Sequence, residues 1–182
     1  MTTESGAIEW FQPRRRALFA IEGIRVARSL RRVLRQGHYE IKFDTSFEEV
    51  MRSCMRPSDN WISEDLIRVY TQAHLEGWAH SVECWQEGTL VGGLYGLALG
   101  GCFCAESMFH RKANFSKVAL WAAVEECRRQ GFLLFDAQVI NPHLRSLGAF
   151  EVSHEHYMSL LARAMSVVTP WSAHGEPETP YS

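Results

Sequence analysis

Two carboxylates interrupt segments of the sequence that are otherwise apolar. Glu106 lies within Cys-Phe-Cys-Ala-Glu-Ser-Met-Phe (102–109), and Asp136 directly follows the apolar run Phe-Leu-Leu-Phe (132–135). A carboxylate in a buried strand is costly unless it is paired or used in chemistry. Asp136 and Gln138 share a face of a strand, so an anionic acceptor and an amide could converge on one small polar ligand. A buried hydrogen-bond network that caps strand ends is an equally good interpretation.

The residue types of common cofactor and metal sites do not occur in the patterns that those sites need. No Gly-x-Gly-x-x-Gly or Walker-type loop is present, and Asn-Phe-Ser-Lys (114–117) lacks the glycine-rich pyrophosphate loop of coenzyme A binders. The histidines form no His-Glu-x-x-His pattern, and the pair Cys102-x-Cys104 has no second pair. Cys104 and Ser107 lack the local signature of a nucleophile, so they are predicted to pack. We therefore expect no metal and no cofactor.

Positive charge is concentrated at one end of the chain. The net charge is −2, whereas residues 1–42 hold eight Arg and one Lys against four Glu, a balance of +5 that leaves −7 for the remainder. Within 25–35, Arg recurs at spacings of three and four, which on a helix places guanidinium groups along one face. Arg binds phosphate in bidentate fashion, so this face favours nucleic acid, although a solvated helix face is the alternative. This Arg stripe comprises Arg25, Arg28, Arg31, Arg32 and Arg35.

The composition indicates a globular chain that folds by itself. Hydrophobic residues make up 46% of the sequence, which excludes the disordered, collagen-like and coiled-coil classes. The five cysteines are scattered among apolar neighbours, which favours buried free thiols. No apolar window is long enough to span a bilayer, and the first residues lack the basic and apolar parts of a signal peptide. We therefore expect a cytoplasmic protein that binds no membrane.

Helix patterns fill the first part of the chain, and strand patterns follow. The predicted helices are 23–36, 47–54, 63–74, 114–130, 142–147 and 154–165, and the predicted strands are 39–43, 79–85, 90–99, 102–108, 132–135 and 149–152. An antiparallel meander, a helix, a buried strand, a helix and a strand predict an α+β fold. Its sheet is expected to be N-acetyltransferase-like, mixed and largely antiparallel, and flanked by helices. We expect a flexible segment at 1–13, a single domain at 14–165 and a disordered tail at 166–182.

Several motifs occur in a particular order and spacing. They are Trp61-Ile-Ser, Gly-Trp-Ala-His-Ser-Val-Glu-Cys-Trp (77–85), Leu-Val-Gly-Gly-Leu-Tyr-Gly (90–96), Phe-Cys-Ala-Glu-Ser-Met-Phe (103–109), Ser116-Lys117, Phe-Asp-Ala-Gln-Val-Ile-Asn-Pro-His (135–143) and Ser-Leu-Gly-Ala (146–149). Over roughly residues 8–165, the sequence resembles the bacterial leucyl/phenylalanyl-tRNA–protein transferases.

The resemblance implies an activity and partners. Members of that family move Leu, Phe or Met from its tRNA to the N-terminal amine of a protein that begins with Lys or Arg, which marks that protein for degradation. They use an N-acetyltransferase-like fold without coenzyme A. The expected partners are therefore aminoacyl-tRNA and proteins or peptides with a basic N-terminal residue, and we expect the chain to be a monomer.

The resemblance also implies roles for individual residues. By similarity, Asp136 attracts or deprotonates the acceptor amine, and Gln138 orients the amine and the ester carbonyl. An alternative stays open, in which the tRNA terminus assists and Asp136 acts only electrostatically. Trp61 corresponds to a residue at the terminal adenosine of the tRNA, Glu106 to one near the bound aminoacyl group, and the Arg stripe to the tRNA-binding helix. Ser107 and Asn141 are further polar residues of the site.

An apolar pocket for the aminoacyl side chain is implied as well. Leu120, Ala123 and Cys127 fall on one helix face, which agrees with a shared pocket, but the last two are smaller than the aromatic residues expected there. We expect Phe135 to refill the space. One methylene in an apolar pocket discriminates by only about 1 to 3 kcal/mol, so the preference between Leu and Phe stays open. The predicted lining is Leu94, Phe103, Ala105, Glu106, Leu120, Ala123, Cys127 and Phe135.

The start of the chain and the acceptor leave alternatives open. Family members usually carry an N-terminal segment with a Gly-Phe-Pro-Trp-type motif that helps to hold the adenosine, and this sequence begins just after it. Either the gene start is misassigned, or this is a short form with weaker tRNA binding. A truncated, inactive relative that binds tRNA or N-termini is one alternative function, and a coenzyme A-dependent N-acetyltransferase is a less favoured one. Some related transferases act on acidic N-termini, but the negative remainder of the chain favours basic acceptors.

Overall fold

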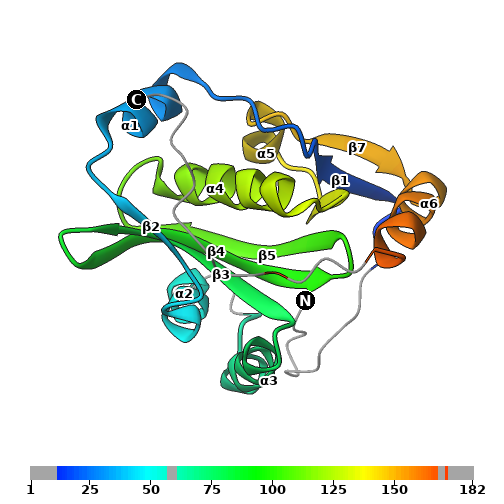
Figure 1. The fold of residues 1–182 in the computed structure, drawn as a ribbon, viewed down its shortest axis with the longest axis horizontal. Coiled ribbons are helices and arrows are strands. Elements are labelled where there is room, and N and C mark those ends of the chain that lie inside the picture. The colour runs from blue at the N-terminus through cyan, green and yellow to red at the C-terminus, as the bar shows by residue number, and fades with distance from the viewer. Residues whose placement is uncertain (1–11, 57–60, 168–170, 172–182) are drawn as a thin grey trace.

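A mixed β-sheet of seven strands runs through the part of the chain that the computed structural model describes, residues 12–56, 61–167 and 171 (Figure 1). The strands are β1 (Arg15–Phe19), β2 (Glu40–Phe43), β3 (Ala79–Gln86), β4 (Thr89–Leu99), β5 (Cys102–His110), β6 (Leu134–Gln138) and β7 (Phe150–Ser153). The helices are α1 (Arg28–Gln36), α2 (Phe47–Cys54), α3 (Glu64–Leu75), α4 (Phe115–Gln130), α5 (Pro142–Ser146) and α6 (His154–Met165). Most of the predicted flexible segment 1–13 and most of the predicted tail 166–182 lie outside the described residues.

The order of the strands confirms the predicted α+β class. The strands follow one another as β2-β3-β4-β5-β6-β1-β7, and every neighbouring pair is antiparallel except β5 and β6, which are parallel. The predicted meander is β3, β4 and β5, and the predicted buried strand is β6. No described helix is long and apolar enough to cross a membrane.

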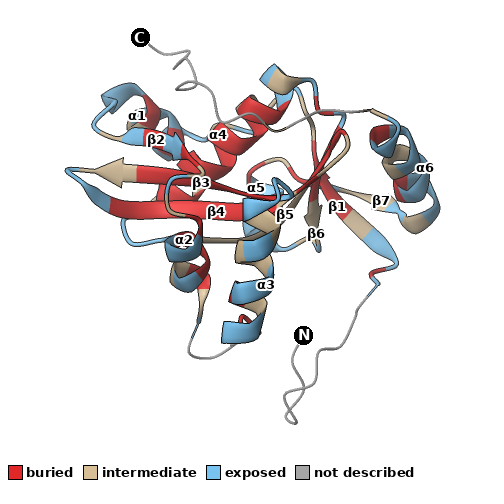
Figure 2. Cartoon of the chain, turned by 60° about the horizontal axis from the view of Figure 1, so that its bottom comes forward, coloured by how far each residue is buried: buried red, intermediate tan, exposed pale blue. Residues whose placement is uncertain are grey.

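Helices cover both faces of the central sheet. The helix α4 packs on one face, and α2 and α3 pack on the other (Figure 1). Buried residues are concentrated in α4 and in the central strands (Figure 2). Most of the residues in α4 are buried, and its small side chains Ala119, Ala122 and Ala123 let the helix approach the sheet closely. Burying a large apolar side chain contributes about 1.5 to 3 kcal/mol, so this layer supplies much of the stability of the fold.

Two features near the start of the chain differ from the prediction. The strand β1 was not predicted, because it is short and its partners are β6 and β7, which are remote in sequence. The helix α1 begins at Arg28 rather than at residue 23. The segment before it is held outside the helix, since the backbone N–H of Arg25 donates to the carbonyl oxygen of Leu147 at 2.8 Å. Arg25 therefore lies outside the basic helix, which corrects the prediction.

The strands β5 and β6 separate after a short paired stretch. The two strands pair in parallel over three residues each, from Cys102 opposite Leu134 to Cys104 opposite Asp136. The strand β5 then bulges against β4, where Gly96 pairs with Ala105 and the next recorded pair skips one residue of β5. Only glycine fits at this bulge, because a Cβ on Gly96 would overlap the carbonyl oxygen of Cys104. The bulge bends β5 away from β6 and opens a gap between the two strands.

Candidate active site

A cavity of about 400 Å³ lies where β5 and β6 separate. Crevices beyond the carboxyl ends of parallel strands are common ligand sites in open sheets. One side of this cavity comes from β5, the other from β6 and the segment after it, and α4 and α5 contribute apolar side chains. The lining residues are Phe19, Arg56, Trp61, Leu94, Ala105, Glu106, Ser107, Met108, Leu120, Ala137, Gln138, Val139, Asn141 and Leu144.

The cavity brings together most of the residues that the sequence pointed to. Trp61, Leu94, Ala105, Glu106, Ser107, Leu120, Gln138 and Asn141 all line it. Phe103, Ala123, Cys127 and Phe135 do not line it, because each is 0% exposed and packs in the core layer behind the cavity. They can therefore affect the shape of the cavity only through the residues in front of them.

Several lining residues were missed by the sequence reasoning. Phe19 belongs to the unpredicted strand β1, and it contacts Phe135 edge-on with 6.0 Å between ring centroids. Leu144 lies three residues after Asn141, whose side-chain oxygen caps α5 by accepting the Leu144 N–H at 2.8 Å. The sequence offered a signal for Leu144, because residues three apart on a helix share a face and Asn141, which was predicted to belong to the site, caps α5.

Glu106 is the one carboxylate among the described residues that line the cavity. It is the residue of β5 that the bulge leaves without a partner on β4. The side-chain amide of Gln138 donates to it at 3.0 Å. Burial raises the pKa of Glu106, the bond from Gln138 opposes this, and the nearby charge of Asp136 raises the pKa further. A carboxylate with a raised pKa is a better proton acceptor at neutral pH.

Asp136 has no surface on the cavity. It is 0% exposed, and its two oxygens are enclosed by donors. Arg16 Nε donates to them at 2.9 and 2.8 Å, Arg16 Nη2 lies 2.7 Å from Oδ2, and the Tyr157 hydroxyl donates to Oδ2 at 2.8 Å. The backbone N–H of Gln138 donates to Oδ1 at 2.8 Å. A carboxylate has about four acceptor positions, so this one is saturated without a ligand.

Asp136 and Gln138 are thus connected to each other instead of converging on one ligand. The sequence predicted a shared face, but Gln138 adopts a left-handed backbone with φ of 64°, which turns its side chain into the cavity. Such a conformation costs on the order of 1 to 3 kcal/mol for a residue other than glycine, and the bond to Asp136 offsets part of that cost.

The side chain of Gln138 presents a hydrogen-bond acceptor to the cavity. Its Nε2 donates to the carbonyl oxygen of Ala105 at 3.0 Å and to Glu106 at 3.0 Å, so both donors are used on β5. No donor among the described residues reaches its carbonyl oxygen. That oxygen is therefore available to an N–H group of a ligand.

Four of the five arginines of the Arg stripe lie on α1, and none of the five lines the cavity. Arg28, Arg31, Arg32 and Arg35 line an exposed groove on this helix. In the part of the chain that the structure describes, none of them pairs with a carboxylate, and the first turn of α1 holds no acid. A row of unpaired guanidinium groups attracts phosphate.

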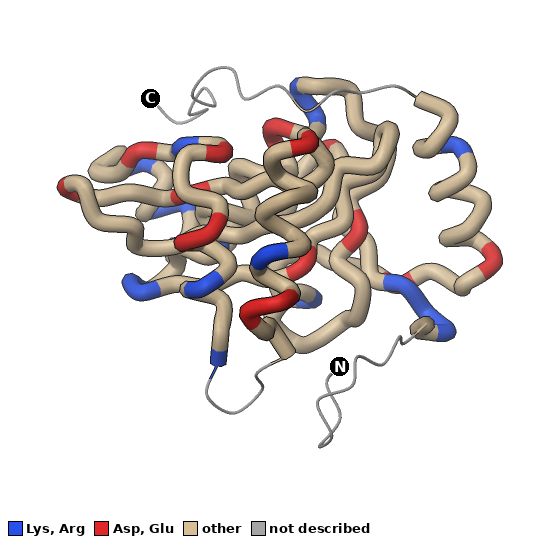
Figure 3. The backbone as a smooth tube through the Cα atoms, turned by 90° about the horizontal axis from the view of Figure 1, so that it is seen from below, with Lys and Arg blue, Asp and Glu red and all other residues tan. Residues whose placement is uncertain are grey.

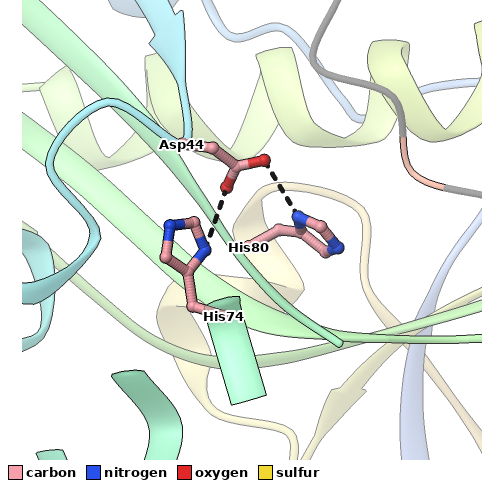
Figure 4. Close-up of side chains that lie close together, drawn as sticks. All are labelled: Asp44, His74 and His80. Carbon is pink, nitrogen blue, oxygen red and sulfur yellow. Dashed lines mark hydrogen bonds and ion pairs between the residues drawn. The ribbon is translucent and has the colours of Figure 1, made fainter. Parts of the chain in front are cut away.

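A third polar cluster joins Asp44, His74 and His80 (Figure 4). His80 Nδ1 lies 2.9 Å from Asp44 Oδ2, and its Nε2 lies 3.1 Å from the carbonyl oxygen of Gly77. His74 Nδ1 lies 2.8 Å from the carbonyl oxygen of Ala79 and 3.8 Å from Asp44 Oδ1. The cluster is a hydrogen-bond network that ties the end of α3 to β3, and we assign no metal to it.

Comparison with known proteins gives a consistent result. Residues 18–162 match the family model described as leucyl/phenylalanyl-tRNA protein transferase. A protein named leucyl/phenylalanyl-tRNA–protein transferase from Chlorobaculum tepidum is 47% identical over 167 residues, which is 90% of this chain and 86% of the relative. Proteins of the same name from Herpetosiphon aurantiacus and Rhizorhabdus wittichii are 46% and 44% identical, over 89% and 92% of this chain and 85% and 69% of the relatives. The matched span includes every residue that lines the cavity.

Proposed function

This chain belongs to the leucyl/phenylalanyl-tRNA protein transferase family, and we propose that it carries out the reaction of that family, the transfer of Leu or Phe from charged tRNA to a protein. The cavity between β5 and β6 is the proposed site of transfer. The observation that carries this assignment is the pairing of Gln138 with Glu106, which brings an amide and a carboxylate together on an otherwise largely apolar cavity.

The chemistry needs alignment more than activation. The ester that joins an amino acid to its tRNA is already reactive, and an α-amine with a pKa of about 7.7 to 8.0 is partly neutral at cytoplasmic pH. The amine nitrogen forms an amide bond with the ester carbonyl carbon, and the bond from that carbon to the ribose oxygen breaks. One proton passes from the amine to the ribose oxygen. Correct alignment of the two reactants can supply most of the rate enhancement.

The lining residues suit these reactants. The carbonyl oxygen of Gln138 accepts an N–H of the incoming amine and orients its lone pair. Glu106 attracts the amine as its ammonium form and accepts a proton from it, for which a raised pKa is favourable. Asp136 acts on the amine only through Gln138 and through its charge, which favours the electrostatic interpretation left open by the sequence. Ser107 and Asn141 supply further polar positions.

The apolar side of the cavity suits the side chain of the transferred residue. Leu94, Leu120, Phe19 and Leu144 line this side. A volume of about 400 Å³ is large enough for Leu, Phe or Met, which we propose as the transferred residues. Pockets of roughly 300 to 1,000 Å³ are typical of small-molecule sites. A cavity of this size cannot hold a whole tRNA, so we propose that only the aminoacyl end enters.

An aromatic residue and two sets of arginines suit the binding of tRNA. Trp61 and Arg56 both line the cavity, so it offers an aromatic face for the terminal adenine and a guanidinium for its phosphate. The arginines on α1 hold more distant phosphates. Phosphate contacts carry no sequence information, so the choice of amino acid depends on the cavity.

The acceptor proposed here is a protein that begins with Lys or Arg, which its modification marks for degradation in the cytoplasm. The carboxylate of Glu106 in the cavity and the negative remainder of the chain both favour a basic acceptor.

Transfer assays test this proposal directly. Radiolabelled Leu and, separately, Phe on tRNA are offered with peptides that begin with Lys, Arg, Asp or Ala, at low salt and with no added cofactor. We expect label on the Lys and Arg peptides. Label on the Asp peptide alone would overturn the choice of acceptor. A folded protein that binds tRNA but labels no peptide would instead be a binding module, and acetylation of the peptides from acetyl-CoA would indicate an acetyltransferase.

A further inference from the structure

Two residues outside the cavity hold the buried carboxylate of Asp136. Arg16 comes from β1 and Tyr157 from α6, and neither belongs to the predicted site. Arg16 is the last residue of a continuous basic segment at the start of the described chain (Figure 3). Its neighbours Arg14 and Arg15 are exposed, whereas the side chain of Arg16 is only 20% exposed. Arg15 pairs with Glu151, which is 22% exposed, at 3.7 Å, whereas the partner of Arg16 is fully buried and lies at 2.7 Å.

The contacts around Asp136 fix its carboxylate in position and direction. Arg16 binds both oxygens, and its guanidinium also lies 5.0 Å from the centre of the Tyr157 ring, so the two donors hold each other in place. Tyr157 is 7% exposed and bonds Oδ2, which leaves Oδ1 turned to the backbone N–H of Gln138. The carboxylate has one arrangement in which all these bonds are made.

The same carboxylate determines where the amide of Gln138 points. The N–H that donates to Asp136 belongs to the residue with φ of 64°, and the side chain that follows from this backbone lines the cavity. Loss of the Asp136 contact would allow the backbone to relax towards the ordinary strand region and would turn the side chain away from Glu106.

We infer that Arg16 and Tyr157 are positioning residues for aminoacyl transfer: they hold Asp136 so that it fixes the backbone of Gln138 and aims its amide at the acceptor amine. This inference rests on the proposed function. A role in stability alone explains the contacts less well, because a buried ion pair often stabilises a fold no better than apolar residues of similar size.

Removal of a single hydroxyl separates positioning from stability. Tyr157→Phe keeps the ring over Arg16 and removes one donor from a carboxylate that is 0% exposed. The matched control is Ser81→Ala, which removes the hydroxyl that donates to the equally buried carboxylate of Glu83 at 2.8 Å, on β3 and away from the cavity. Both variants lose the same kind of bond, so a merely structural role predicts the same effect on activity.

The expected results differ between the two variants. A small displacement of a catalytic group can cost up to about 100-fold in rate, so we expect Tyr157→Phe to lower kcat about tenfold or more while the KM for aminoacyl-tRNA changes less than about twofold. Ser81→Ala should keep kcat within about twofold of the wild-type value. Equal losses in both variants, or an unchanged kcat in Tyr157→Phe, would overturn the inference.

Chemical rescue tests Arg16. Arg16→Ala leaves a partly exposed space in front of Asp136 that methylguanidinium can enter, because the wild-type side chain is 20% exposed. We expect added methylguanidinium to restore part of the lost kcat, and methylammonium, which offers no planar fork, to restore less. If Arg16→Ala does not fold, Arg16→Lys takes its place and should keep KM for tRNA but lose kcat. A folded Arg16→Ala or Arg16→Lys with wild-type kcat would contradict the role of Arg16.

A measurement on the protein without substrates keeps this inference separate from the proposed function. Hydrogen exchange of the Gln138 backbone amide reports its bond to Asp136 directly. It should become faster in Tyr157→Phe and stay at the wild-type rate in Ser81→Ala. If the wild-type chain transfers nothing, the proposed function fails, and equal Gln138 exchange in both variants then overturns the positioning as well.

Discussion

Gln138 Nε2 lies 3.0 Å from Glu106 Oε2, so an amide on β6 donates to a carboxylate on β5 across the gap where the two strands separate. The same nitrogen donates to the carbonyl oxygen of Ala105, which ties both the backbone and the side chain of β5 to one residue. The bulge in β5 and the left-handed backbone of Gln138 are both needed for this contact. Two local departures from regular strand geometry thus create the polar part of the proposed site.

Replacement of Gln138 by Ala should remove transfer but not tRNA binding. The variant loses the acceptor for the amine and the bridge to Glu106, and we expect kcat/KM to fall on the order of 100-fold. Single-turnover transfer from labelled Phe-tRNA measures the rate, and filter binding of the same tRNA gives its affinity. Gln72→Ala on α3 is the matched control, because it removes an exposed amide that also donates to a glutamate, and wild-type rates are expected for it.

Replacement of Asp136 separates a chemical role from a supporting one. Asp136→Ala leaves the guanidinium of Arg16 without its carboxylate, which should destabilise the fold by about 3 to 5 kcal/mol. We expect transfer to be lost and tRNA affinity to be kept wherever the variant is folded, since no arginine of the Arg stripe bonds to Asp136. Urea unfolding gives the first quantity, and transfer with tRNA binding gives the others. Unchanged turnover would contradict any role of Asp136 in the reaction.

The strands of the meander and the packing of α4 were predictable because their patterns are local. Apolar runs with glycine turns identify β3, β4 and β5, and the helical spacing identifies α4. The strand β1 was not predictable in this way, because a short Arg-rich segment becomes a strand only through partners far along the chain. The first residue of α1 was predicted wrongly for the same reason, because the hydrogen bond from Arg25 to the distant Leu147 holds the preceding segment outside the helix.

The sequence predicted which residues lie near the site better than it predicted which of them reach the surface of the cavity. Helical spacing correctly places Leu120, Ala123 and Cys127 on related turns of α4, but only the sheet in front of them decides that Leu120 reaches the cavity. The partners of Asp136 are separated from it by 120 residues in the case of Arg16 and 21 in the case of Tyr157. No periodicity connects residues so far apart, so the saturation of this carboxylate could not be foreseen.

Loss of two arginines from α1 should weaken tRNA binding in a salt-dependent manner. Each phosphate contact contributes about 0.7 to 0.9 to the slope of log K against log salt, so Arg28→Ala with Arg32→Ala should reduce that slope by about 1.4 to 1.8. Transfer at saturating tRNA should be unchanged, because neither residue lines the cavity. A titration of tRNA at several salt concentrations tests this, with Arg68→Ala on α3 as the control for loss of surface charge. An unaltered slope would remove α1 from the tRNA-binding surface.

Glu106→Gln should stabilise the protein at neutral pH. Burial raises the pKa of Glu106 in the folded state above its value in the unfolded chain. At a pH below the unfolded pKa, Glu106 is neutral in both states and does not destabilise the fold. As the pH rises through the folded pKa, the buried side chain must ionise, and the free energy of unfolding falls. Gln keeps an acceptor for Gln138 but never ionises. We therefore expect the variant to have the higher Tm at pH 7, with a difference that disappears near pH 4. Differential scanning measurements across this range decide the matter, and an equal Tm at every pH would show that Glu106 titrates normally.

Residues that line the cavity should affect which amino acid is transferred, whereas residues in the core layer behind it should not. Leu120 touches the cavity, so Leu120→Ala should enlarge it and shift the preference from Leu towards Phe by about 1 to 3 kcal/mol in relative kcat/KM. Cys127 lies on the same helix but is buried behind the lining, so Cys127→Ala should leave the preference unchanged while costing some stability. Competition between Leu-tRNA and Phe-tRNA for one Arg-initiated peptide measures the ratio. A shift in Cys127→Ala as large as that in Leu120→Ala would mean that the bound side chain enters the core layer, as the family resemblance had implied.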